Sequence, residues 1–205
     1  MVNLKDSRNA FVCNLLAQYM HQGSLVRLVP IERRHFAKSL EWLKDTTVTE
    51  YLPVSETVDI HKEISSLEHL LKSDFARGFA VETLEGEHIG NGVLHHIDFR
   101  NKRAEFSGLL GETSFWGKGY AVEATALVLE TAFEKLGLNK VYCRISVDNM
   151  RAQEFSKKMG FTQEGVLRQE VLKNEEFVDF GIYSLLAEEY FRLKGTLGSL
   201  ASGKD

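Results

Sequence analysis

The sequence predicts a mixed α/β (α+β) fold in which one central sheet is flanked by helices. Apolar residues recur at helical spacing in the first third of the chain, and short apolar segments separated by turn residues follow in the middle. The remainder alternates helical and extended patterns. The chain has 205 residues, 43% of them hydrophobic, so one continuous core can form. Only two prolines and no low-complexity linker occur, which favours a single main domain.

Three parts of the chain differ in pattern. Residues 1–22 are expected to form an N-terminal arm, because residues 8–20 place apolar side chains at helical spacing. This arm offers a surface to the body of the protein or to a second subunit, so a homodimer is possible. Residues 23–194 form the main domain. Residues 195–205 are rich in glycine and serine and are expected to be disordered.

The main domain opens with a strand and two helices. Residues 24–29 are mostly apolar and Pro30 ends the run, which predicts a strand. Residues 31–45 and 59–75 each carry apolar residues on one stripe, which predicts two amphipathic helices.

An antiparallel meander, a long helix and a second set of strands are predicted next. Turn-like residues separate the strands, and Gly137 and Gly160 stand where helices end. The predicted segments are strands 79–82, 87–96 and 103–110, helix 122–136, strand 140–147, helix 150–159, and strands 161–171 and 177–186.

Composition argues against several classes of protein. The 25 basic and 29 acidic residues give a formal net charge of −4, which argues against a nucleic-acid partner. The two cysteines, Cys13 and Cys143, lack the spacing of a metal or redox site, and no metal is expected. No apolar run approaches the roughly 18 residues of a membrane span, and no signal peptide opens the chain. We therefore expect no membrane contact and a cytoplasmic location.

Two glycines bracket a lysine just before the long helix. Around Gly117, Lys118 and Gly119, several backbone N–H groups can turn toward one point, with the positive end of the helix dipole behind them. This pattern predicts an anion site suited to a diphosphate, with Lys118 at its rim. A glycine-rich helix start without a ligand is the alternative. The spacing from Gly111 to Gly117 does not match a nucleoside-triphosphate P-loop, and no third glycine completes a dinucleotide fingerprint.

Several further blocks follow the glycine loop in a fixed order. They are Asn149 before a short helix, Met159-Gly160-Phe161 at its end, Glu164-Gly165, Asp179, and Tyr183-Ser184-Leu185-Leu186 in the last strand. Together with the loop they resemble the GNAT superfamily of acetyl-CoA-dependent acetyltransferases. The most similar branch contains ribosomal-protein N-terminal (alanine) acetyltransferases and spermidine acetyltransferases.

The resemblance implies a fold, a co-substrate and a set of binding residues. It implies a mixed sheet of about seven strands. The fourth and fifth strands, here residues 103–110 and 140–147, would splay apart, and the pantetheine arm of acetyl-CoA would lie in the opening. Leu110 and Gly111 would lie beside the thioester, where a backbone N–H could polarise its carbonyl. The residues implied to bind the coenzyme are Leu110, Gly111, Trp116, Gly117, Lys118, Gly119, Tyr120, Ala121 and Asn149. Asn149 also suits an N-cap of the helix that follows it.

Two positions depart from the family pattern. Trp116 stands where the loop usually begins with Gln or Arg, so a polar contact to phosphate has to come from the backbone or from Lys118. Ser156 stands where many members carry a tyrosine that protonates the departing thiolate. A serine hydroxyl is a much weaker acid than a phenol, so Ser156 is expected to hold the sulfur or a water, or to be a surface residue of its helix.

An amine acceptor has to lose a proton before it attacks a thioester, because an ammonium ion has no lone pair. Glu105 is the first choice for the base, since it lies on the strand that leads to the thioester and its Ala-Glu block resembles the family's. A solvated carboxylate at the strand end is the alternative. Glu112, Asp98 and His96 are the reserve candidates. The segment after Glu105 is one residue longer than in many relatives, so a bulge is possible there.

Adjacent histidines and one cysteine complete the candidate groups. His95 and His96 are expected to point to opposite sides of a strand, which would prevent them from sharing a metal ion. Cys143 alternates with core residues and is expected to be a buried hydrophobic side chain rather than an acetyl-accepting nucleophile.

Two functions of different classes are consistent with these residues. The first is an N-acetyltransferase that moves the acetyl group of acetyl-CoA directly to a primary amine on a protein N-terminus, a polyamine or an amino sugar. The second is a CoA-binding regulatory or scaffold module with weak or no catalysis, which the serine at position 156 keeps open.

Overall fold

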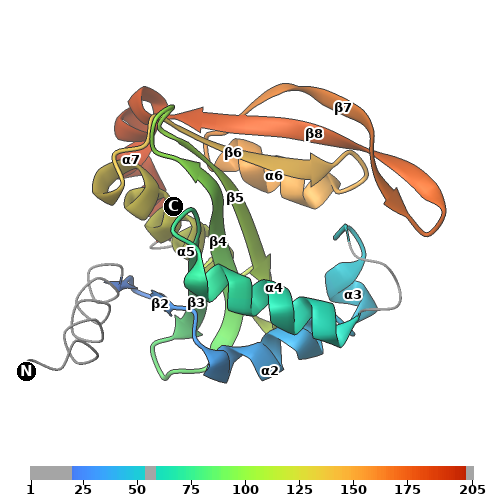
Figure 1. Ribbon diagram of the computed structural model, residues 1–205. Coiled ribbons are helices and arrows are strands. Elements are labelled where there is room, and N and C mark those ends of the chain that lie inside the picture. Colours follow the sequence, from blue (N-terminus) through green and yellow to red (C-terminus); the bar gives the residue numbers. More distant parts are fainter. Residues whose placement is uncertain (1–19, 54–58, 202–205) are drawn as a thin grey trace, which may run out of the picture.

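The computed structural model describes residues 20–53 and 59–201, and its centre is one sheet of eight strands (Figure 1). The strands are β1 His21–Gln22, β2 Val26–Pro30, β3 Arg77–Thr83, β4 His88–Asp98, β5 Arg103–Leu110, β6 Lys140–Ser146, β7 Thr162–Lys173 and β8 Glu176–Leu186. Their order in the sheet is β1-β2-β3-β4-β5-β6-β8-β7. Every neighbouring pair is antiparallel except β5 and β6, which are parallel. The expected mixed sheet and its meander are confirmed.

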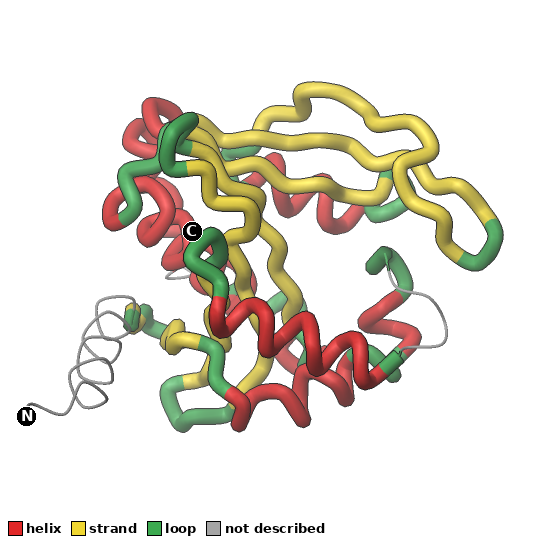
Figure 2. Tube along the Cα trace, in the orientation of Figure 1, coloured by secondary structure: helices red, strands yellow, loops and turns green. Residues whose placement is uncertain are grey.

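Helices cover both faces of this sheet (Figures 1 and 2). They are α2 Arg33–Trp42, α3 Thr46–Thr49, α4 Ile60–Lys72, α5 Tyr120–Glu130, α6 Met150–Lys158 and α7 Ala187–Ala201, with a 3₁₀ turn η1 Thr113–Phe115 and a π-helical segment η2 Thr131–Lys135. Helices α2 and α4 lie on one face, here called the acceptor face, and α5 and α7 lie on the other. The cross-connection between β5 and β6 contains α5, as a parallel strand pair requires.

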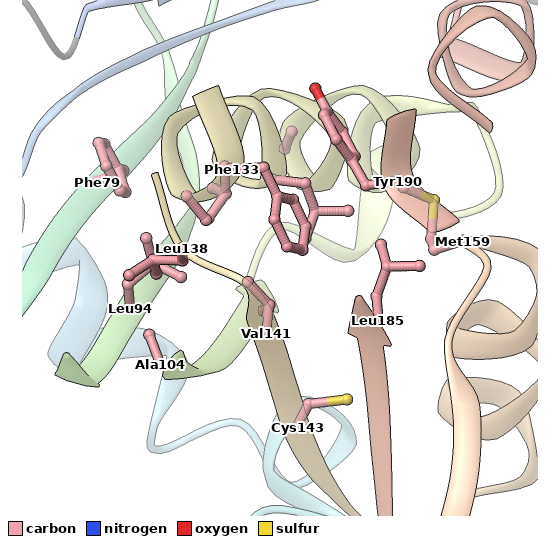
Figure 3. Close-up of a cluster of buried hydrophobic side chains, with 14 of the residues drawn as sticks. Phe79, Leu94, Ala104, Phe133, Leu138, Val141, Cys143, Met159, Leu185 and Tyr190 are labelled. Carbon is pink, nitrogen blue, oxygen red and sulfur yellow. The ribbon is translucent and has the colours of Figure 1, made fainter. Parts of the chain in front are cut away.

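The hydrophobic core lies between the sheet and helices α5 and α7 (Figure 3). Leu94, Val141 and Leu185 project from three different strands and are fully buried. Phe133 stacks on Tyr190 with ring centroids 4.8 Å apart, which joins η2 to α7. Each of these large apolar groups removes surface from water, so the core fixes α5 against the strands that surround the open part of the sheet.

A buried carboxylate fixes the start of α5 against the first strands. Both oxygens of Glu123 accept hydrogen bonds of 2.6–2.7 Å, from the backbone N–H groups of Ser24, Leu25 and Val26 and from the Ser24 hydroxyl. Glu123 is 5% exposed and lies in the first turn of the helix, where a negative charge also meets the positive end of the dipole. The helix that follows the glycine loop is therefore held at its first turn.

The parallel strands β5 and β6 pair only at their beginnings. Their register couples Arg103 to Lys140, Ala104 to Val141 and Glu105 to Tyr142, and it ends there. Beyond this point β5 continues to pair with β4, and β6 continues to pair with β8. Residues 107–110 of β5 therefore have no strand on the β6 side, and we call them the open edge. The expected splay of these two strands is confirmed.

Three expectations about boundaries differ from the structure. His21 and Gln22 were expected in the arm. They pair with β2 and form one more strand, β1, which brings the sheet to eight strands. Helix α7 runs through residues 195–201, part of the tail expected to be disordered, because adding a residue to an existing helix costs far less than starting one. The long central helix changes to π geometry at η2, where Leu136 N–H donates to Thr131 O. The helical arm predicted over residues 8–20 falls almost wholly outside the described residues.

Candidate active site

The glycine loop has the backbone geometry that an anion site needs. Gly117 and Gly119 have φ of 73° and 87°, a region that side chains with a Cβ rarely adopt. No described residue accepts a hydrogen bond from the backbone N–H groups of residues 117–122. Three of these, at Tyr120, Ala121 and Val122, belong to the first turn of α5, where N–H groups lack a partner within the helix. The loop therefore presents free donors at the positive end of a helix dipole.

The open edge of β5 presents further free backbone groups. Gly111 N–H donates to Ile89 O on the β4 side over 2.9 Å. This bond shows which residues of β5 direct their backbone groups at β4 and which direct them away from it. Bonded and non-bonded pairs alternate in an antiparallel ladder, so the N–H and C=O groups of Phe106, Gly108 and Leu110 point away from β4. The Phe106 N–H is used in the last pair with β6, next to Tyr142, and Leu110 O accepts from Trp116 Nε1. The remaining groups face the opening between β5 and β6, where an extended ligand can bind as an added strand would.

Leu110 and Gly111 are both expected beside the thioester, and only one of their amides is available to polarise its carbonyl. The Gly111 N–H donates to Ile89 O and is not available to an oxyanion. The residue is a glycine for another reason: a Cβ at this position would lie 2.0 Å from the ring of Trp42. Leu110, one residue earlier, is the neighbour whose N–H faces the opening.

Trp116, at the first position of the loop, contacts the open edge. Its indole Nε1 donates to Leu110 O over 2.7 Å. The guanidinium of Arg151, from α6, lies over the same ring at 4.6 Å from its centroid. Trp116 thus connects the loop after β5 to the helix after β6.

Asn149 is the N-cap of α6. Its side-chain Oδ1 accepts a hydrogen bond from Ala152 N over 2.9 Å, which confirms the capping role. No described residue accepts a hydrogen bond from its amide NH₂ group, so the same side chain keeps two donors for a ligand.

Ser156 and Cys143 lie together in the interior, beneath the opening. Ser156 is 4% exposed, which rules out the surface role, and its Oγ lies 3.9 Å from Cys143 Sγ. Burial raises the pKa of the Cys143 thiol to about 12. The expectation of a buried, unreactive cysteine is confirmed, because a thiol nucleophile has to ionise.

Glu105 is the last residue of β5 that pairs with β6 before the two strands separate. The residue is buried, with 9% of its surface exposed. One oxygen accepts from Arg144 Nε over 2.8 Å, and the other lies 3.2 Å from His96 Nδ1. Arg144 in turn donates to Glu170 over 3.0 Å. Glu105 is therefore an oriented carboxylate in a charged cluster and not a solvated strand end.

The two adjacent histidines lie on one face of the sheet, which corrects the expectation that they point apart. The register of β4 against β5 shifts between His95 and Asp98, and His96 has φ of 48°. This bulge turns His96 to Glu105, while His95 Nε2 lies 2.8 Å from Ser107 Oγ. Burial lowers the pKa of His95, so the ring is neutral at neutral pH. β5 pairs regularly with β4 from Glu105 to Leu110, and beyond it the N–H groups of Gly111 and Glu112 both donate to Ile89 O, which is the hydrogen-bond pattern of the bulge considered after Glu105.

The other reserve bases have structural partners. Glu112 accepts hydrogen bonds from Lys38 Nζ and Trp42 Nε1, and the contact with Lys38, followed by that with Trp42, lowers the pKa of this carboxyl. Asp98 accepts from the backbone and side chain of Asn101, and these hydrogen bonds lower its pKa. Both carboxylates stabilise loops, and both are weaker proton acceptors than a free carboxylate.

A pocket of about 280 Å³ lies between the end of α3 and the β7–β8 hairpin. Its walls include Val178 and Phe180, and Ser146 and Asp148 contribute from the end of β6. Ser146 is two residues beyond Arg144, which places the pocket about 7 Å along the strand from the Glu105 cluster and on the same face. The pocket therefore adjoins the mouth of the opening.

The charge of this pocket is mainly negative. Carboxylates come from Glu50, Asp148 and Glu176, and the single ammonium group is that of Lys173. Lys173 Nζ donates to the backbone carbonyls of Thr49 and Glu50, so its charge is directed at the end of α3. The sequence indicates that residues 33–75 and 174–179 shape the acceptor pocket, but it singles out none of these charged residues. The turn at residues 173–175 was recognised, but nothing local shows that the hairpin reaches α3.

Within the described residues, no group of three or more His, Cys, Asp or Glu side chains could hold a metal ion. The described helices also include none that is long and apolar enough to cross a membrane.

Comparisons with known proteins agree with this geometry. A family model described as an acetyltransferase (GNAT) domain matches residues 26–162. The uncharacterized N-acetyltransferase p20 of Bacillus licheniformis is 29% identical over 73% of this chain and 86% of that protein. Spermidine N(1)-acetyltransferase of Escherichia coli (strain K12) is 29% identical over 77% of this chain and 84% of that protein.

The crystal structure of spermidine N-acetyltransferase from Vibrio cholerae in complex with CoA and spermine superimposes with a TM-score of 0.74. The superposition covers 82% of this chain and 99% of the Vibrio cholerae chain, and the two sequences are 24% identical. At that identity the likeness supports the fold alone.

Proposed function

The chain belongs to the GNAT acetyltransferase family and is an acetyl-CoA-dependent N-acetyltransferase, and we propose that it acetylates a primary amine of a polycationic acceptor by direct transfer. The observation that carries the proposal is the position of an acidic pocket at the mouth of the opening between β5 and β6. The coenzyme enters from one side of this opening, and the acceptor enters from the other.

The coenzyme half of the proposal uses backbone groups. The free N–H groups of residues 117–122 bind the diphosphate, and Lys118 adds a mobile positive charge. The pantetheine arm lies along the open edge and exchanges hydrogen bonds with Gly108 and Leu110, while the NH₂ group of Asn149 donates to it from the β6 side. The thioester then reaches the region of Glu105, where the two strands meet.

The acceptor nitrogen is activated at Glu105. Each carboxylate oxygen has one partner and keeps a second acceptor direction, so the carboxylate can take a proton from the ammonium form of the acceptor. The side chain of His96 is 73% exposed and contacts the same carboxylate, which gives the proton a route to solvent.

The chemical step is attack of the neutral amine nitrogen on the thioester carbon. A C–N bond forms, the nitrogen of the tetrahedral intermediate loses its extra proton to water, and the intermediate collapses as the C–S bond breaks to release the CoA thiolate. Ser156, buried next to Cys143, holds the leaving sulfur or a water that protonates it. Cys143 takes no part as a nucleophile, because its thiol stays protonated.

The pocket favours an acceptor with several positive charges. Three carboxylates line a space whose only lysine is directed at backbone carbonyls, so a chain of ammonium groups finds compensating charges there. Similarity to spermidine acetyltransferases supports the same class of acceptor. Spermidine and spermine are the first substrates to test.

Thiol release from acetyl-CoA, followed with a panel of amines, tests the proposal. The panel contains spermidine, spermine, a peptide with a free N-terminus and an amino sugar. The proposal predicts the highest kcat/KM for the polyamines, with loss of this preference in Asp148→Asn/Glu176→Gln. Preference for the peptide or the sugar would contradict the polycationic acceptor.

A CoA-binding module without catalysis is the second candidate, and the serine at position 156 is the observation that favours it. Binding of CoA without turnover of any amine in the panel would support this candidate over the first.

A further inference from the structure

One arginine near the glycine loop has no ionic partner. The guanidinium of Arg151 lies over the ring of Trp116 at 4.6 Å, and it makes no ion pair or hydrogen bond within the described part of the chain. Arg144 offers a contrast, because two carboxylates, Glu105 and Glu170, occupy its donors. The chain carries more acidic than basic residues, so an exposed arginine without a carboxylate partner needs an explanation.

Stacking leaves the binding edge of a guanidinium free. A guanidinium held over an aromatic face by cation–π attraction makes no hydrogen bond to a carboxylate in that contact, so its N–H donors stay available for an anion. Trp116 also limits where the arginine can go, because the indole is itself fixed by its hydrogen bond to Leu110 O. The pair Trp116–Arg151 therefore presents an oriented, unused anion-binding edge.

The location of this edge identifies its ligand. Trp116 directly precedes Gly117, the first of the residues whose amides have no partner. Arg151 comes from the first turn of α6, on the opposite side of the opening. An anion bound by the loop amides would thus meet Lys118 from one side and Arg151 from the other.

We propose that Arg151 binds the diphosphate of the coenzyme, with Trp116 as the positioning residue that holds it there. This inference rests on the proposed coenzyme site. It also accounts for the tryptophan at a loop position where the family usually has a polar residue: the charge lost from the loop is supplied by α6, across the opening. A bidentate contact between guanidinium and phosphate suits this geometry.

The first test measures the dissociation constants of CoA and 3′-dephospho-CoA by calorimetry for the wild type and for Arg151→Gln. Both ligands contain the diphosphate, and only CoA contains the 3′-phosphate. Loss of a charge-assisted hydrogen bond to phosphate raises the dissociation constant about 10-fold to 100-fold, and the proposal predicts the same increase for both ligands. Arg100→Gln changes an arginine that is also exposed, in the turn before β5, and as the matched control it leaves both constants unchanged.

The second test is a double-mutant cycle. Trp116→Leu removes the stacking ring and raises the dissociation constant about threefold to fivefold. If Trp116 acts through Arg151, the double variant Trp116→Leu/Arg151→Gln binds CoA no more weakly than Arg151→Gln alone. Arg151→Lys restores part of the affinity, since a lysine keeps the charge but loses the planar fork.

The outcomes separate this inference from the function on which it rests. Wild-type protein that fails to bind CoA would overturn the coenzyme site itself. Normal binding by Arg151→Gln would overturn only the role of Arg151. An increase seen with CoA and absent with 3′-dephospho-CoA would assign Arg151 to the 3′-phosphate and contradict the diphosphate assignment, and simple additivity in the cycle would contradict the role of Trp116.

Discussion

The two halves of the site use different groups of the polypeptide: the coenzyme half uses mainly the main chain, and the acceptor half uses side chains. On the coenzyme side, most of the proposed contacts come from the main chain, at residues 117–122 and along the open edge. On the acceptor side they come from side chains, such as Glu105, Asp148 and Glu176. Main-chain donors are the same whatever the sequence, whereas side chains change with it. The coenzyme half therefore tolerates a departure such as Trp116, while the acceptor half sets which amine is used.

This comparison predicts that the largest effect on catalysis comes from one acceptor-side carboxylate. Glu105→Gln removes the proposed proton acceptor and keeps the size of the side chain, so kcat should fall about 100-fold or more. The dissociation constant of CoA should change less than about threefold, because the loop and the open edge stay intact. Steady-state kinetics and calorimetry measure the two quantities, with Glu85→Gln in the β3–β4 turn as the matched control. Unchanged turnover across the pH range would reject Glu105 as the base.

A backbone change on the coenzyme side should give the opposite pattern. Gly119→Val forces a β-branched residue into φ of 87°, and its Cβ would lie 3.3 Å from Leu25 Cδ1, so the loop backbone has to shift. We expect the dissociation constant of CoA to rise about 30-fold, a loss comparable to one or two charge-assisted hydrogen bonds. Gly165→Val is the control, because a Cβ there meets no atom within 4 Å and φ is not positive. If Gly119→Val binds CoA tightly and circular dichroism shows an intact fold, the proposal that the loop binds the diphosphate is contradicted.

Loss of charge in the acidic pocket should change the KM for the amine acceptor and leave the KM for acetyl-CoA unchanged. In Asp148→Asn/Glu176→Gln, two of the three pocket carboxylates lose their charge while the pocket keeps its shape. The KM for a polyamine should rise about 10-fold, since each contact with a charged group is worth about 1.5 kcal/mol or less at a partly exposed site. The KM for acetyl-CoA should stay the same. A change in both KM values would mean that the two halves are not separate.

The smallest effect concerns the stability of the folded protein at acid pH. His35, His88 and His95 on the acceptor face, and His21 in β1, all have a lowered pKa, in each case chiefly because burial disfavours the cation. The unfolded chain therefore binds more protons than the folded one as the pH falls through the unfolded value near 6.5, and stability decreases. Urea unfolding should show a lower midpoint at pH 5.5 than at pH 7.5. A midpoint that stays constant or rises would contradict the assignment of neutral, buried rings.

The coenzyme half was largely predictable from the sequence because its signals are local. Gly117, Lys118 and Gly119 stand within three residues of one another and directly before a helical pattern, and the structure has both glycines at positive φ. Asn149 is likewise recognisable as an N-cap from its place before a short helix. The splay of β5 and β6 could be inferred only from the family resemblance, because strand pairing depends on residues far apart in the chain.

The acceptor half was harder to predict because it depends on departures from regular geometry and on long-range contacts. The positive φ of His96 places both histidines on one face, although alternation in a regular strand would separate them. Lys173 reaches the carbonyl of Thr49, more than a hundred residues earlier, and no local pattern shows this contact. The sequence also could not show which amide, that of Leu110 or that of Gly111, is available, since the partner of Gly111, Ile89, is set by the register of the sheet.

Amide hydrogen exchange with and without CoA, followed residue by residue by NMR, tests the central claim that the main chain binds the coenzyme. We expect CoA to slow exchange at residues 117–122 and at Gly108 and Leu110, whose N–H groups are free. Ser107 and Leu109, which pair with β4, should exchange slowly before CoA is added and change little. Unchanged exchange at the loop and the open edge in the presence of saturating CoA would contradict the account.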